Sequence, residues 1–151
     1  MSSIFQKLNL KAQSDIFVLN APESFEPELR ALENVNVHRK ASARKQVDFA
    51  LAFVTKQKEV DALAQTFGKK ARGDAVIWFA YPKASSKKYK CEFNRDNGWT
   101  ALGKQGFEPV RMVAIDEDWS ALRFRLVENI KTMTRSFAMT KEGKKKAARK
   151  K

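Results

Sequence analysis

The chain of 151 residues contains a single cysteine, Cys91, and a single histidine, His38. One cysteine cannot form an internal disulfide, which agrees with residence in a reducing compartment. The two side chains are also too few for a zinc site, which normally takes several cysteine or histidine ligands. The sequence therefore predicts a cytoplasmic protein without a metal site.

Long apolar runs are absent as well. No stretch approaches the roughly 20 apolar residues of a membrane-spanning helix. The N-terminal residues 1–7 lack the continuous apolar segment of a secretory signal. Apolar residues nevertheless make up 43% of the chain, including 11 Phe and 3 Trp, which is enough to bury the core of one domain.

Glycine is scarce: the chain has six, and the first of them is Gly68. Glycine-rich turns allow a backbone to approach a bound dinucleotide closely, and none can follow a strand in the first 67 residues. A P-loop of the form Gly-x-x-x-x-Gly-Lys is also absent. These absences argue against ordinary NAD binding and against P-loop nucleotide binding.

The segments that are present alternate between strand and helix patterns. Short apolar runs predict strands buried on both faces at 16–19, 47–54 and 75–80, and residues 35–37 predict a short second strand. Amphipathic segments after the runs 16–19 and 47–54 predict helices, which Ser24 and Thr55 should cap. A third, short helix carries Trp99 and Leu102, and all three tryptophans are expected in the core.

The last two predicted strands, 110–115 and 119–127, are separated by three residues. Three residues cannot make a parallel crossover, so this pair must be an antiparallel hairpin. The sequence therefore predicts a three-layer, Rossmann-like α/β domain, with a mostly parallel sheet and an antiparallel C-terminal edge hairpin.

Positive charge is concentrated at the C-terminus. The net charge is +13, and residues 131–151 hold nine Lys or Arg against the single acid Glu142. We expect residues 1–130 to form the domain and 131–151 to be a basic, largely disordered tail. The tail is expected either to bind nucleic acid nonspecifically or to be a solubilising end without a partner; the cations concerned are Lys144, Lys145, Lys146, Arg149, Lys150 and Lys151.

Parts of this pattern resemble known proteins. The second half is similar to class I S-adenosylmethionine-dependent methyltransferases, in which a helix ending in Gly-Phe, as at Gly106-Phe107, precedes two closing antiparallel strands. Over about residues 8–130 the chain looks more closely like a bacterial family of small Rossmann-like domains, through its segments 18–23, 78–83 and 115–124. This resemblance implies the fold and no particular activity.

The chain departs from the methyltransferase pattern where the cofactor would bind. The family's glycine-rich turn after the first strand is replaced by Asn20–Ser24, in which Pro22 has no amide donor. The acid expected after the second strand is replaced by His38-Arg39-Lys40, and the acidic turn after the run 47–54 by Thr55-Lys56-Gln57. We therefore expect no S-adenosylmethionine binding and no cofactor.

A binding site is expected at the carboxyl ends of the strands, where open α/β sheets bind ligands. The strand ending at Leu19 should neighbour the one ending at Val54, with a crevice between them. Lysine and hydroxyl donors, and a helix N-terminus at Thr55, would suit a small anionic ligand. The candidate residues are Asn20, Glu23, Thr55, Tyr81, Lys83, Ser85, Ser86 and Arg95; for the segment 81–88 the alternative is a solvated loop.

No group of residues indicates catalysis. Cys91 lacks a neighbouring histidine or helix start that would make it a thiolate, and His38 beside two cations is expected in a solvated loop. Residues 116–118, all acidic, are adjacent on a tight turn and are expected to form a charged hairpin tip rather than an acid–base pair or a metal site.

The sequence favours a noncatalytic binding domain for a small anion or a protein partner. The alternatives are a divergent methyltransferase or another enzyme, and a chiefly nucleic-acid-associated protein. Against the last stands the absence of a helix-turn-helix, a zinc finger or an RNA-binding strand signature. The oligomeric state is left open.

Overall fold

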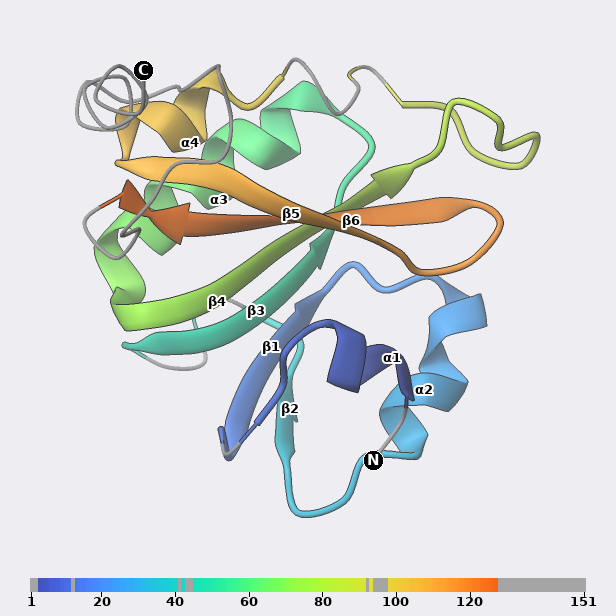
Figure 1. The fold of residues 1–151 in the computed structure, drawn as a ribbon, viewed down its shortest axis with the longest axis horizontal. Helices are drawn as coiled ribbons and strands as arrows, with labels where there is room; N and C mark the ends of the chain where they lie inside the picture. Colours follow the sequence, from blue (N-terminus) through green and yellow to red (C-terminus); the bar gives the residue numbers. More distant parts are fainter. Residues whose placement is uncertain are drawn as a thin grey trace, which may run out of the picture.

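The computed structural model describes residues 3–11, 13–40, 42, 45–91, 93 and 98–127 (Figure 1). The predicted tail at 131–151 and the candidate Arg95 lie outside these residues. In chain order the elements are α1 (Ser3–Lys7), β1 (Asp15–Leu19), the 3-10 helix η1 (Glu23–Phe25), α2 (Glu26–Arg30), β2 (Asn36–His38), β3 (Val47–Phe53), α3 (Gln57–Lys70), β4 (Ala71–Pro82), α4 (Thr100–Lys104), β5 (Phe107–Ala114) and β6 (Trp119–Leu126). Among the helices described, none is long and apolar enough to cross a membrane.

The six strands form one sheet in the order β2-β1-β3-β4-β6-β5. The pairs β2–β1, β1–β3 and β3–β4 are parallel, whereas β6 is antiparallel to both β4 and β5. The predicted fold class is confirmed, including the C-terminal hairpin and the adjacency of β1 and β3. The chain leaves β1 toward β2 on one side and β3 toward β4 on the other, as the sequence predicts.

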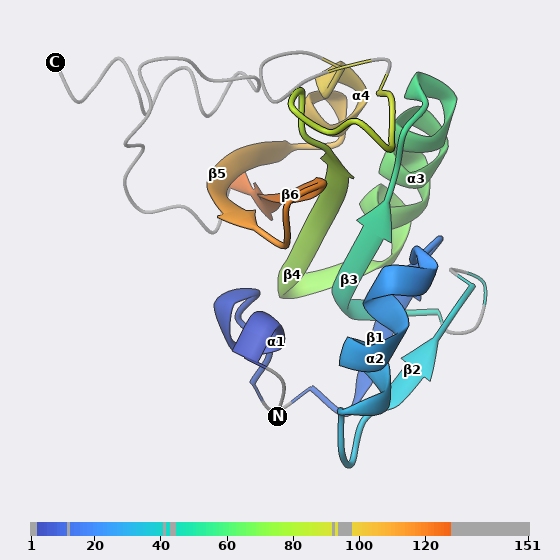
Figure 2. The same ribbon diagram turned by 90° about the vertical axis from the view of Figure 1, so that its right-hand side faces the viewer.

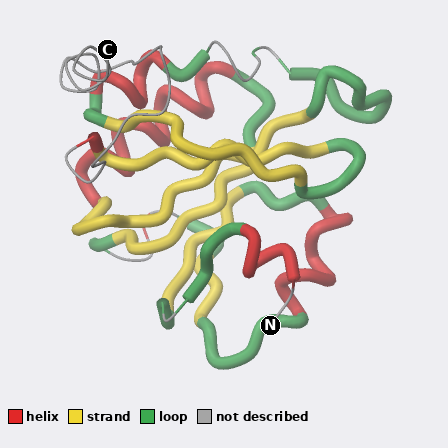
Figure 3. Tube along the Cα trace, in the orientation of Figure 1, coloured by secondary structure: helices red, strands yellow, loops and turns green. Residues whose placement is uncertain are grey.

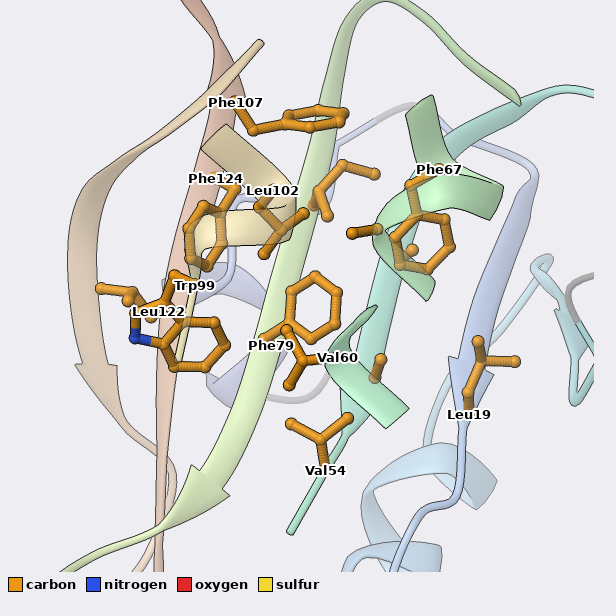
Figure 4. Close-up of a cluster of buried hydrophobic side chains, with 14 of the residues drawn as sticks. Leu19, Val54, Val60, Phe67, Phe79, Trp99, Leu102, Phe107, Leu122 and Phe124 are labelled. Atoms are coloured by element: carbon orange, nitrogen blue, oxygen red, sulfur yellow. The ribbon is translucent and has the colours of Figure 1, made fainter. Parts of the chain in front are cut away.

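Helices cover both faces of the sheet, so that the domain has three layers (Figures 1, 2 and 3). On the face of α3 and α4, Phe79 lies among Phe67, Trp99 and Phe124, with ring centroids 5.7 to 5.9 Å from its own (Figure 4). Strand β3 is buried on both faces along nearly its whole length, as its continuous apolar run predicts.

The other face is closed by α1 and α2, and α1 is an element that the sequence patterns did not reveal. Phe5 and Leu8 are fully buried there, beside Phe25 of η1 and Phe49 of β3. Trp78 on β4 donates its indole N–H to the Leu8 carbonyl at 2.7 Å, which satisfies a donor in the centre of the core. Trp78, Trp99 and Trp119 are all buried, as predicted.

Both predicted helix caps are wrong. Ser24 lies inside η1, and α2 follows this 3-10 turn with Phe25 at its N-cap position and Pro27 in its first turn. At α3, the N–H groups of Thr55 and Lys56 donate to the Glu59 carboxylate at 2.9 and 3.0 Å. Lys56, and not Thr55, is thus the N-cap residue, and the Glu59 side chain reaches back to its N–H.

Candidate functional site

A cavity of about 750 Å³ lies at the carboxyl end of β4, between the segment 83–93 and the β5–β6 hairpin. Its polar lining comprises Lys83, Ser86, Tyr89, Lys90 and Ser120. The apolar lining includes Pro82, Phe93 and Met112, and Tyr81 donates its hydroxyl to the Met112 sulfur at 3.4 Å. A largely apolar wall with a few polar groups is typical of small-molecule sites.

The hairpin tip holds the wall of this cavity in place. The Ser86 hydroxyl donates to the Asp118 carboxylate at 2.9 Å, and the Lys83 N–H donates to the Asp118 carbonyl at 2.8 Å. The Asp116 carboxylate accepts the N–H groups of Asp118 and Trp119 at 2.8 and 2.9 Å. These oxygens stabilise the turn and tie it to the segment after β4, so Asp116 and Asp118 have structural partners.

The structure brings only part of the predicted site together. Tyr81, Lys83 and Ser86 line the cavity, whereas Ser85 is exposed and is not among the lining residues. Asn20, Glu23 and Thr55 follow β1 and β3 and do not line the cavity either. The cavity therefore lies at the end of β4, next to the antiparallel hairpin, and not between β1 and β3.

The N–H groups directly before α3 are engaged by an acid of the same helix. Thr55 and Lys56 both donate to the Glu59 carboxylate, at 2.9 and 3.0 Å. The Glu59 carboxylate therefore lies at this helix end, where its negative charge opposes the binding of an anion.

Several cavity residues were not found from the sequence. Tyr89, Lys90 and Phe93 belong to a segment that carries no periodic pattern, and Ser120 lies on β6 directly opposite Tyr81 of β4. The pairing of β6 with β4 places Ser120 opposite Tyr81, and the pairing of β5 with β6 brings Met112 to the same side. No local signal in the sequence indicates the pairing of β6 with β4.

His38 lies on strand β2 and not in the solvated loop that the sequence predicts. Its Nε2 lies 2.9 Å from the Asp15 carboxylate and its ring packs 5.1 Å from that of Phe17. The side chain is 20% exposed, so it is not a solvated loop residue. The parallel pairing of β1 with β2 brings residues 15–17 beside 36–38 and explains this contact.

At the end of β2, Arg39 forms a bidentate ion pair with Glu26. Arg39 donates both terminal nitrogens to the Glu26 carboxylate of α2, at 2.8 and 2.9 Å. The hydrogen bond from Arg39, with its charge, holds the pKa of Glu26 below its usual range. A two-pronged pair of this kind occupies both carboxylate oxygens of Glu26.

No protein family model and no curated protein matches the chain. Among solved structures, an S-adenosylmethionine-dependent methyltransferase from Aquifex aeolicus matches with a TM-score of 0.56 and 12% identity, over 82% of this chain and 87% of that chain. The chain has a methyltransferase-like fold. At this identity the likeness extends to the fold and no further.

Two other solved structures are similar to this methyltransferase-like chain at a lower level. The N-methyltransferase NodS from Bradyrhizobium japonicum has a TM-score of 0.49 and 12% identity, over 82% of this chain and 93% of that chain. The fibrillarin pre-rRNA processing protein from Methanococcus jannaschii has a TM-score of 0.48 and 14% identity, over 77% of this chain and 67% of that chain. The fold assignment rests on the Aquifex structure.

Proposed function

We propose that this chain is a noncatalytic, cytoplasmic binding domain that takes a small organic anion in the cavity at the end of β4. One observation carries the proposal: the cavity combines two ammonium groups, Lys83 and Lys90, with an apolar wall, and its described lining residues include no carboxylate. A carboxylate or phosphate on an apolar or aromatic body matches that combination. Phe93 and Met112 would contact the body, and the lysines would contact the charge.

The turn after β1 supports the noncatalytic part of the proposal, because its residues do not fit S-adenosylmethionine. Asn20 adopts the left-handed conformation, with φ 58, in which glycine is usual, and it retains a side chain there. Pro22, two residues later, has an extended backbone and no N–H to donate. Close approach of this turn to a cofactor is therefore obstructed.

Side chains near the ends of β2 and β3 support the same conclusion. The rings of Phe25, Phe53 and Trp119 pack in series, with centroids 5.0 and 5.1 Å apart, beside the carboxyl end of β3. At the end of β2, where a ribose would need a free acid, the Glu26 carboxylate is held by Arg39. We therefore assign no step of a methyl transfer to this chain.

The proposal is tested by the double substitution Lys83→Gln and Lys90→Gln. Losing one charge-assisted hydrogen bond costs about 1.5–3 kcal/mol, so affinity should fall by roughly 10-fold to 100-fold per lysine that contacts the anion. Phenyl phosphate and benzoate, titrated by calorimetry, are suitable probes. Lys58→Gln with Lys69→Gln, on the exposed side of α3, is the matched control. Equal affinities of the two double variants would contradict the proposal, as would a native protein that binds neither probe.

The second candidate is a divergent methyltransferase, which the similarity to the Aquifex enzyme favours. We expect calorimetry of the full chain with S-adenosylmethionine and with S-adenosylhomocysteine to give no binding. The reasons are the Asn20 side chain in the turn after β1 and the engaged Glu26. A dissociation constant in the low micromolar range for either compound would establish the enzyme alternative.

Nonspecific nucleic-acid affinity of the basic residues 131–151 is the remaining part of the proposal. It rests on nine Lys or Arg against one acid in that segment. A protein partner at the cavity is the alternative occupant. A partner that binds there would compete with phenyl phosphate.

A further inference from the structure

Three arginines lie on one face of the β5–β6 hairpin. Arg111 of β5 is directly opposite Arg123 of β6 in the register, and Arg125 is two residues further along β6. Arg123 is in turn paired with Trp78 of β4, whose side chain belongs to the core on the α1 and α2 face. The three side chains therefore lie on that face. Strand β5 forms the free edge of the sheet beside them (Figure 2).

The acids on this face neutralise only one end of the row. Asp74 of β4 accepts two hydrogen bonds from Arg125, the one from Nε at 2.7 Å. Glu108, the other acid, is buried and lies opposite Arg125 in the register. Arg111 and Arg123 have no ion pair with an acid among the described residues.

Arg123 is in an unfavourable position for a lone cation. Its Nε is buried and has no hydrogen-bond partner among the described residues. Burial, and then the neighbouring charges of Arg125 and Arg111, lower the pKa of Arg123, whereas the charge of Asp74 opposes this. Like charges directly opposite each other on adjacent strands destabilise a sheet. An anion bound between Arg111 and Arg123 would remove the repulsion between their charges.

The guanidinium pair favours a phosphate group in particular. Arginine presents several N–H donors in a planar fork that matches two phosphate oxygens, and it sheds water more readily than lysine does. The chain continues from β6 into residues 131–151, with their net charge of +8, only a few residues beyond Val127. A polymer of phosphates is the anion that can contact both the folded face and this basic segment.

We propose that Arg111 and Arg123 form a binding surface for the phosphodiester backbone of a nucleic acid. This arginine surface is distinct from the cavity at the end of β4. Tyr81 and Phe93 of that cavity belong to the core on the α3 and α4 face, whereas Arg123 shares a face with Trp78. The arginine surface does not rest on the small-anion proposal.

The test is fluorescence anisotropy of the full chain with a labelled 24-base-pair DNA duplex over 50–200 mM salt. Each phosphate contact contributes about −0.9 to the slope of log affinity against log salt for duplex DNA. The double variant Arg111→Gln with Arg123→Gln should therefore have a slope shallower by about 2. The native protein's advantage over this variant should then shrink about tenfold between the two salt limits.

Three comparisons decide the result. Lys58→Gln with Lys69→Gln on α3 removes the same charge from the opposite face and should leave the slope unchanged. Arg111→Lys with Arg123→Lys keeps the charge and should retain most of the slope. Lys83→Gln with Lys90→Gln should not change the slope, which separates this surface from the cavity.

If Arg111→Gln with Arg123→Gln lowers the melting temperature, the single variant at the exposed Arg111 should still lower the slope by about 1.

Other outcomes would overturn the proposal. If only the substitution of Lys144, Lys145 and Lys146 by Gln lowers the slope, the basic segment acts alone and the arginine surface has no role. If phosphatidylglycerol vesicles bind the native protein and displace the duplex at equal phosphate, the surface is one for lipid headgroups. A labelled single-stranded RNA of the same length serves as a second probe, with a smaller expected change of about 1.4 in slope.

Discussion

Replacing Phe79 with Ala is expected to lower the free energy of unfolding by about 4 kcal/mol. The Phe79 side chain is fully buried, and its ring contacts Phe67 of α3, Trp99 before α4 and Phe124 of β6. The substitution would remove an aromatic ring that joins two helices to the sheet and leave a cavity among rigid neighbours, which cannot collapse to fill it.

Urea unfolding followed by tryptophan fluorescence measures this loss. Because domains are stable by only about 5–15 kcal/mol, the Phe79→Ala variant should lose roughly a quarter or more of its stability and unfold at a clearly lower urea concentration. Lys58→Ala is the control, because that side chain is exposed on α3 and its removal should cost less than about 0.5 kcal/mol. A loss below about 1 kcal/mol for Phe79→Ala would mean that the aromatic cluster does not hold the two layers together.

Replacing Gly98 with Ala is expected to cost about 2–5 kcal/mol and to weaken binding in the cavity. Gly98 has φ +89, and an added Cβ would lie 2.5 Å from the Cβ of Phe93. Left-handed backbone costs about 1–2 kcal/mol for a residue with a side chain, and overpacking adds about 1–3 kcal/mol. Phe93 lines the cavity, so its displacement should also lower the affinity for phenyl phosphate.

Gly106 provides a matched comparison for the crowding at Gly98. Its φ is +88, but an added Cβ would lie 3.8 Å from the Leu126 side chain, which is ordinary van der Waals contact. Gly106→Ala should therefore cost only the backbone part, about 1–2 kcal/mol, and leave the cavity unchanged. Thermal and urea unfolding of both variants give the difference, and equal losses would show that Phe93 is not pressed against Gly98.

The parts of the fold that the sequence predicts correctly are those determined by local patterns. The run 47–54 is apolar because β3 is buried on both faces, and the hairpin follows from the three residues between 115 and 119. The sequence patterns do not reveal helix α1, because its apolar residues span little more than one turn and Phe5 packs against the distant Phe25 and Phe49. Strand β4 starts at Ala71, whereas the sequence predicts a start at residue 75. The polar Asp74 interrupts the apolar pattern, but its ion pair with Arg125 of β6 keeps it within the sheet.

The cavity could be predicted only in part, for a similar reason. Lys83 and Ser86 follow an apolar strand, so their place at its carboxyl end can be inferred from the sequence alone. The position of Ser86 depends on Asp118, 32 residues later, and that contact fixes the segment that carries Lys90. Helix-end electrostatics place Thr55 in the predicted site, but they do not reveal that the Glu59 carboxylate of the same helix lies at that end and accepts the Thr55 N–H.

The antiparallel pairing of β4 with β6 also bears on how the chain folds while it is synthesised. Ile77 of β4 pairs with Phe124 of β6, which leaves the ribosome 47 residues later. Chains grow at roughly 5–20 residues per second. The edge of β4 that faces β6 therefore stays unpaired for about 2–9 s, while the other edge can already pair with β3. An apolar strand edge left open in this way can pair with a second nascent chain. Translation pauses before β6 has left the ribosome would lengthen that exposure, whereas later pauses would not.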